Sequence, residues 1–203
     1  MMRGTDEIVA VAEELLSKRF GGTQSLTDIE KLGGSGTAIV LRARVAPSPF
    51  LQQRSVVLKY TPATNDSMDD AALIREVVSY QFTTSLPKDV RPGPVLLAYD
   101  IDSRLLVISD SGEGETFADL LNYSGPEQRL QLLRNLGQSI GRMHAGTADR
   151  EQHFDILLTR MLSRYPDTAE LHEMRDASLL VSIDNGIELL SNADVQVPHV
   201  VRD

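Results

Sequence analysis

The chain has 203 residues, of which 41% are hydrophobic and 24% charged, and it contains no cysteine. These proportions exclude an intrinsically disordered chain, and without cysteine neither a disulfide framework nor a thiolate site can form. The formal net charge of −9 repels both a nucleic-acid backbone and an anionic membrane, so neither is an expected partner.

Residues 1–22 predict an N-terminal amphipathic helix rather than a secretion signal. Acidic side chains interrupt the apolar positions, and the pair Gly21-Gly22 is typical of a helix end. No other apolar run approaches the roughly 20 residues that a membrane-spanning helix needs. We therefore expect a soluble, cytoplasmic protein, a compartment that the lack of cysteine also suits.

Residues 23–112 predict a strand-rich unit with one internal helix. Segments rich in β-branched and aliphatic residues predict strands at 37–45, 55–60, 95–99 and 105–108, the last two joined as a hairpin. The internal helix is expected from about Ala71, after a polar stretch whose aspartates suit helix capping, to about Ser85. The predicted order around the glycine-rich stretch LGGSGTAIVL is a helix before it and a strand after it.

Residues 113–203 predict an all-helical unit, so the expected fold class is α+β. Helical spacing is found in TFADLLNY, in RLQLLRNLGQSIGRMHAG, and over residues 154–165 and 168–190. One stripe of the second of these helices collects its apolar residues, which are Leu130, Leu133, Leu136, Ile140 and Met143. No internal repeat is present.

The glycine-rich stretch at residues 32–41 is the first feature that could carry chemistry. The sequence lacks a Walker phosphate loop, and a Rossmann fingerprint needs a strand before its glycines and a helix after them. The remaining architecture is a glycine-rich hairpin whose backbone N–H groups approach nucleotide phosphates. On the motif alone, a glycine-rich turn without a ligand is the leading alternative.

Lys59 and Glu76 are the second and third features. Lys59 stands in the apolar strand VVLKY, where a buried ammonium needs an anionic partner; the alternative is an exposed lysine on an edge strand. Glu76 shares a face of the predicted helix with Leu73 and Tyr80, from which it could reach Lys59. Its alternative is a solvated helix carboxylate.

In their order and spacing these features resemble the N-terminal lobe of the aminoglycoside phosphotransferase and choline kinase family, which has a protein-kinase-like fold. The motifs are LGGSGTAIV for the nucleotide loop, VVLK for the lysine, REVVSY for the glutamate, LLVISDSGEG for the inter-lobe hinge, and LGQSIGRMHA for the helix after it. The resemblance covers about residues 25–148. It implies a kinase-like N-lobe followed by an incomplete helical C-lobe.

The resemblance also implies ATP as the cofactor and a small-molecule hydroxyl as the acceptor. Lys59 would neutralise the α and β phosphates, Glu76 would hold Lys59, and backbone groups near Ser109 and Ser111 would bind the adenine edge. The residues implied to cover the phosphates are Gly33, Gly34, Ser35, Gly36 and Thr37. Mg²⁺ is expected for the complete enzyme, although the sequence identifies no ligand for it.

Two departures from the family pattern concern the loop and the catalytic residues. Ile39 occupies the position of the third kinase glycine, as in the small-molecule branch. The catalytic pattern H-x-D-x-x-x-x-N is not found: His153-Phe154-Asp155 begins it, but Arg160 stands where asparagine is required. Asp184-Asn185-Gly186 is expected to form a turn rather than a magnesium site, and His172 is expected on a solvated helix.

The sequence therefore predicts the ATP-binding part of a small-molecule phosphotransferase, truncated before its catalytic loop, with residues 150–203 as a helical insertion. Two alternatives remain: a non-catalytic nucleotide-binding or regulatory module of the same fold, and an α+β scaffold that binds no nucleotide. Acidic side chains in the helical unit would suit a cationic acceptor, or only a solvated face; they are Asp149, Glu151, Asp155, Asp167, Glu170 and Glu173.

Overall fold

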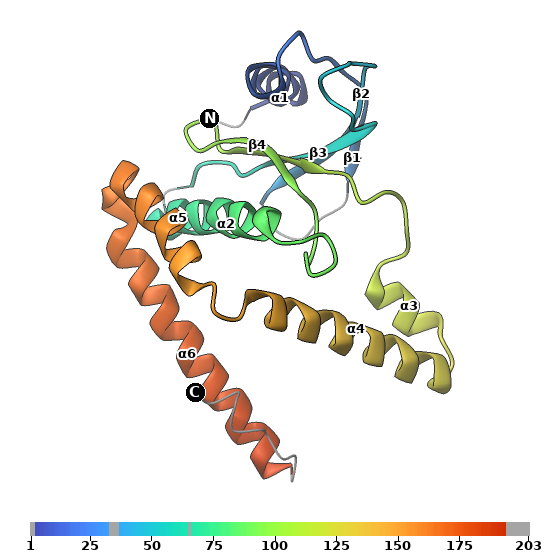
Figure 1. The fold of residues 1–203 in the computed structure, drawn as a ribbon, viewed down its shortest axis with the longest axis vertical. Helices are drawn as coiled ribbons and strands as arrows, with labels where there is room; N and C mark the ends of the chain where they lie inside the picture. Colours follow the sequence, from blue (N-terminus) through green and yellow to red (C-terminus); the bar gives the residue numbers. More distant parts are fainter. Residues whose placement is uncertain (1–2, 33–36, 65, 194–203) are drawn as a thin grey trace.

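The computed structural model describes residues 3–32, 37–64 and 66–193, with the side chains of 67 and 174–176 excepted. Within these ranges the fold is α+β, built from one antiparallel sheet and six α-helices (Figure 1). The elements in chain order are α1 (Thr5–Phe20), β1 (Leu26–Leu32), β2 (Ile39–Val45), β3 (Ser55–Tyr60), α2 (Ser67–Ser85), β4 (Leu96–Asp100), β5 (Leu105–Ser109), α3 (Phe117–Tyr123), α4 (Pro126–Thr147), α5 (Glu151–Arg164), the short 3₁₀ helix η1 (Pro166–Thr168) and α6 (Ala169–Asn192).

The sheet has the strand order β1-β2-β3-β5-β4, and every neighbouring pair is antiparallel. β3 is therefore the central strand. In its register Lys59 lies opposite Val40 of β2 on one side and opposite Leu106 of β5 on the other. Directly opposed residues point to the same face of a sheet, so these three side chains share a face.

Helices cover both faces of the sheet, α1 on one and α2 on the other (Figure 1). On the α1 face, Ile8 and Leu16 pack with Leu58 in one buried cluster. On the α2 face, Ile74 and Val77 of α2 are buried in a second cluster, which the sheet, α2 and Met161 of α5 share. Because side chains alternate along a strand, β3 contributes Val56, Leu58 and Tyr60 to the first cluster and turns Val57 and Lys59 toward α2.

Local capping explains where α2 begins. The sequence-based start near Ala71 is wrong, because the Asp66 carboxylate accepts a hydrogen bond from the Met68 N–H at 2.9 Å and starts the helix at Ser67. Asp69 and Asp70 then fall in the first turn, where the helix dipole favours acidic side chains. The predicted end at Ser85 is confirmed.

Strand β1 was missed from the sequence, and the predicted order of a helix directly before the glycine-rich stretch is wrong. β1 is an edge strand with mostly exposed side chains, and its pairing with β2 is interrupted between Thr27 and Glu30, where Asp28 has a φ of 50°. Such a bulged, charged edge lacks the apolar alternation that identifies a strand. Since Leu32 pairs with Val40, the glycine-rich stretch connects two adjacent antiparallel strands.

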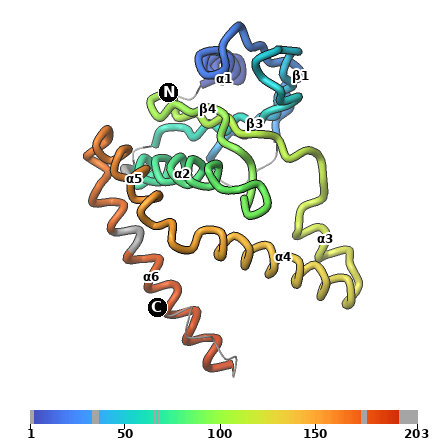
Figure 2. The backbone as a smooth tube through the Cα atoms, viewed as in Figure 1, coloured from blue at the N-terminus to red at the C-terminus, as the bar shows by residue number. Residues whose placement is uncertain are grey.

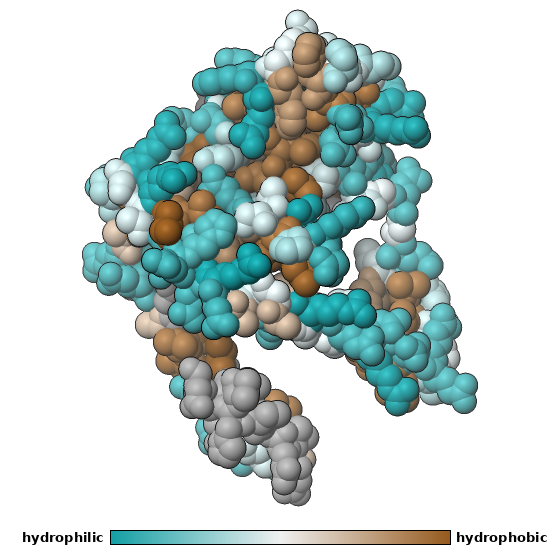
Figure 3. Space-filling view, in the orientation of Figure 1, coloured by the Kyte–Doolittle hydropathy of each residue, from teal (hydrophilic) through white to brown (hydrophobic). Residues whose placement is uncertain are grey.

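The helical part of the chain leaves the sheet through α3 and returns along α4 toward α5 (Figure 2). α5 and the start of α6 pack against α2. The apolar stripe of α4 is exposed instead: Leu130, Leu133, Leu136 and Ile140 each expose 40–51% of their surface. The middle of α6 also presents apolar surface (Figure 3). Over the described residues, no helix combines the length and apolarity that crossing a membrane requires.

Candidate functional site

An ion pair between the central strand and α2 lies at the centre of the candidate site. Lys59 Nζ and Glu76 Oε1 are 2.5 Å apart, and their side chains are 31% and 26% exposed. The predicted contact between these residues is confirmed. Lys59 is not on an edge strand and Glu76 is not a solvated carboxylate, so both alternatives are wrong. The pair remains reachable from solvent.

Tyr80 lies one turn further along α2, and the charges of Lys59 and Glu76 both act on the pKa of its hydroxyl. Burial raises the pKa of the Tyr80 hydroxyl, the Glu76 carboxylate raises it further, and the Lys59 ammonium opposes them. The pKa of Tyr80 therefore lies above its ordinary value, and the phenol stays neutral beside the pair at physiological pH.

A pocket of about 420 Å³ opens over the ion pair. It is lined by Thr37, Ala38, Val40, Lys59, Thr61, Asp69, Ala72, Leu73 and Glu76. The β1–β2 connection thus reaches the pocket through its last residues, Thr37 and Ala38. The other predicted loop residues, Gly33, Gly34, Ser35 and Gly36, lie outside the described part of the chain.

The predicted adenine-edge residues follow the end of β5. The Ser109 N–H donates to the Val95 carbonyl and the Ser109 hydroxyl accepts from the Val95 N–H, both at 2.8 Å. These two groups of Ser109 are thereby bonded to Val95, the residue before β4. Ser111 is exposed and lies beyond the strand pairing, so its backbone is the better placed of the two to meet a ligand.

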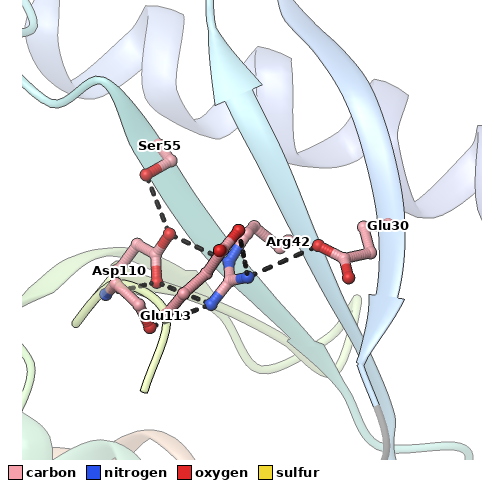
Figure 4. Close-up of polar contacts among 6 residues, drawn as sticks. Glu30, Arg42, Ser55, Asp110 and Glu113 are labelled. Carbon is pink, nitrogen blue, oxygen red and sulfur yellow. Dashed lines mark hydrogen bonds and ion pairs between the residues drawn. The ribbon is translucent and has the colours of Figure 1, made fainter.

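A charged cluster beside this segment was missed from the sequence (Figure 4). Arg42 of β2 pairs with Asp110, with 3.0 Å between Nε and Oδ2, and the Asp110 side chain is only 7% exposed. Burial raises the pKa of Asp110, but hydrogen bonds from the Gly112 N–H and the Ser55 hydroxyl and the charge of Arg42 outweigh it, so the pKa lies below its ordinary value. The alternating arginines Arg42 and Arg44 were the only sequence signal, and they do not identify a partner.

Three further sequence motifs lie in helices. His153-Phe154-Asp155 falls in the N-terminal part of α5, where the His153 ring packs edge-on against Phe82 with 5.6 Å between ring centroids. Asp184-Asn185-Gly186 lies inside α6, so the predicted turn is wrong. His172 is 2% exposed, because the start of α6 packs against α2, and the prediction of a solvated position is wrong too.

Among the described residues, no group of three or more histidine and acidic side chains could hold a metal ion.

Comparisons with known proteins find no matching family and no matching curated protein. Among solved structures, the chain is similar to the crystal structure of a candidate fructosamine-3-kinase from Thermobifida fusca, with 15% sequence identity and a TM-score of 0.35. The match covers 56% of this chain and 34% of that one, so it spans about a third of the length of that protein. A similarity of this size assigns neither a family nor a function.

Proposed function

We propose that this chain is the ATP-binding part of a small-molecule phosphotransferase, which transfers the γ-phosphate of ATP to a hydroxyl when complete. The observation that carries the proposal is the Lys59–Glu76 pair in a pocket that the β1–β2 connection reaches. A glycine-rich connection between antiparallel strands, a lysine on the next strand and a glutamate on the following helix form the phosphate-binding arrangement of kinases.

Lys59 would supply the phosphate contact. An ammonium carries three N–H donors, and Glu76 occupies one, which leaves donors for phosphate oxygens while the carboxylate fixes the position of Nζ. Asp69 and Glu76 outnumber Lys59 among the charged groups of the pocket. We therefore expect a triphosphate to bind there more tightly with Mg²⁺ than without it, since the metal offsets the negative charge.

The base would lie toward the end of β5. Lys59 is opposite Leu106, and Ser109 is three residues further along β5, so about 10 Å separates the two positions at the usual rise of about 3.3 Å per residue. An adenine nucleotide bridges a distance of this kind, with its ribose between phosphates and base. The backbone around Ser111 would then face the adenine edge.

Calorimetric titration of the 203-residue chain with ATP, with and without Mg²⁺, tests the proposal. We expect saturable binding that Lys59→Met weakens by at least about tenfold, because a charged hydrogen bond contributes about 1.5–3 kcal/mol. Lys88→Met, on the exposed loop before β4, is the matched control and should bind as the parent does. Absence of ATP binding to the folded parent would refute the nucleotide site and favour the plain scaffold.

Titration of the 203-residue chain does not separate the catalytic proposal from its alternative, a non-catalytic nucleotide-binding module. No catalytic aspartate is assigned in this sequence, so binding without ADP release is expected of these 203 residues in either case. A longer reading frame that supplies H-x-D-x-x-x-x-N after Asp203 would favour the phosphotransferase. A longer frame without that pattern would favour the module.

A further inference from the structure

The buried carboxylate of Asp110 organises the backbone where the chain leaves β5. Its Oδ1 accepts from the Gly112 N–H at 2.9 Å, and its Oδ2 accepts from the Ser55 hydroxyl at 2.8 Å. A carboxylate that binds the backbone N–H two residues later closes an Asx turn. Gly112 has a φ of 86°, a conformation that favours glycine. The turn therefore sets the course of residues 110–112.

Arg42 joins this turn to the sheet (Figure 4). Its guanidinium pairs with Asp110 and also donates to the Gly112 carbonyl, at 3.0 Å from Nη2. One side chain of β2 thus contacts both ends of the turn. Two carboxylates, Glu30 at 3.4 Å and Glu113 at 3.7 Å, complete the charges around Arg42. The guanidinium presents its donors in a rigid planar fork that contacts both groups at once, a geometry that the compact ammonium of lysine does not have.

These contacts of Arg42 with Asp110 and Gly112, called the clamp below, lie on the same face of the sheet as the Lys59–Glu76 pair. Arg42 is opposite Val57 in the register, and Val57 is two residues from Lys59 on β3, so all three side chains point to the α2 face. Ser111 lies between the two residues that Arg42 contacts and is exposed. The clamp therefore determines how the Ser111 backbone is presented on the side of the sheet where the proposed nucleotide would bind.

We infer that Arg42 and Asp110 are positioning residues that hold the Ser111 backbone in place for the adenine edge of the nucleotide. The inference rests on the proposed function. Both side chains act through the backbone of the turn and need no contact with the nucleotide. Their effect is accordingly confined to the base, whereas Lys59 acts on the phosphates.

Two ligands separate these roles: ATP and inorganic tripolyphosphate, both titrated calorimetrically with Mg²⁺. We expect Arg42→Met to weaken ATP binding by at least about tenfold and to change tripolyphosphate binding by less than about twofold. Lys59→Met should weaken both ligands. Arg44→Met is the matched control, because Arg44 lies two residues along the same strand face and pairs with Asp28 rather than with the turn. It should affect neither ligand.

Arg42→Lys distinguishes positioning from simple charge. It keeps the positive charge but lacks the fork, so we expect it to lose ATP affinity as Arg42→Met does. Asp110→Asn, which keeps the size of the side chain, should show the same loss confined to ATP. All titrations are made below the melting transition of each variant, measured by circular dichroism, so that an unfolded variant is recognised.

The following outcomes would contradict the positioning role of Arg42 and Asp110. Equal losses for ATP and tripolyphosphate in Arg42→Met, or unchanged ATP affinity, would overturn the positioning role while leaving the Lys59 site intact. If Arg42→Lys binds ATP as tightly as the parent does, the positive charge of Arg42 alone explains its effect, and the positioning role is overturned. If the parent protein binds ATP no more tightly than tripolyphosphate, the adenine base contributes nothing to binding, and there is no adenine contact for Arg42 and Asp110 to position. Parent protein that binds neither ligand would refute the proposed function, and the inference with it.

Discussion

Gly146, in the last turn of α4, lies directly against the side chain of Val90. A Cβ added at Gly146 would come within 2.7 Å of Val90 Cβ and 2.8 Å of its Cγ2, closer than real side chains approach one another. This contact joins the helical unit to the loop before β4. The crowded atom is the branched Cβ of valine rather than the end of a flexible chain, so a small shift does not relieve the clash.

We therefore expect Gly146→Ala to lower the free energy of unfolding by about 1–3 kcal/mol, measured by urea denaturation. Gly137→Ala and Gly141→Ala are matched controls in the same helix. Nothing lies within 4 Å of the Cβ at either position, so the higher helix propensity of alanine should stabilise these variants by up to about 1 kcal/mol. Stabilisation by Gly146→Ala as well would mean that α4 does not pack on Val90.

The Lys59–Glu76 pair should contribute a measurable coupling to stability. A double-mutant cycle with Lys59→Met, Glu76→Gln and the double variant isolates the pair from the other contacts of each residue. Both side chains are about two-thirds or more covered, so we expect a coupling of about 1 kcal/mol in urea denaturation, the upper end of the range for exposed pairs. A coupling near zero would indicate that the pair does not form in solution.

Local chemistry made much of the fold predictable. The bounds of β3 follow from its own apolar, β-branched residues, and the end of α2 follows from the helical pattern, which stops at Ser85. β1 was not predictable, because an edge strand is held by hydrogen bonds to β2 rather than by burial of its side chains. The buried position of His172 was likewise hidden, since it depends on packing between α6 and α2, which are far apart in sequence.

The candidate site likewise contains one residue pair that could be predicted from the sequence and one that could not. Lys59 and Glu76 could be paired from sequence because each stands out in its own element, a cation in an apolar strand and an acid on an apolar helix face. Arg42 and Asp110 could not, because they are 68 positions apart in the sequence and a cation in β2 does not identify its partner. Only the strand order, which places β5 beside β3 and β3 beside β2, brings them together.

The exposed stripe of α4 leads to a third prediction. Helical spacing correctly located the helix, but burial of its apolar face requires a partner, and the described residues leave Leu133 51% exposed. We expect Leu133→Gln to change the free energy of unfolding by less than about 0.5 kcal/mol, because glutamine has a similar helix propensity and no core contact is lost. Leu58→Ala, at a fully buried position of β3, should cost about 2–5 kcal/mol. A comparable loss in both variants would show that another surface covers α4 in solution.

The lowered pKa of Asp110 makes part of the stability dependent on pH. A carboxyl whose pKa is lower in the folded chain than in the unfolded chain stabilises the fold above the unfolded pKa, about 3.9 for aspartate. That contribution is lost as the pH falls from there through the folded pKa, when the carboxylate that holds Arg42, Ser55 and Gly112 becomes protonated.

The variant Asp110→Asn has no such titration. We therefore expect the parent to exceed Asp110→Asn in free energy of unfolding by a constant amount from pH 7 to about pH 5, and by progressively less below about pH 4. Urea denaturation of both proteins at each pH measures this difference, and the other carboxylates cancel because both proteins share them. A difference that stays constant down to pH 3 would mean that the Asp110 carboxylate does not make these contacts.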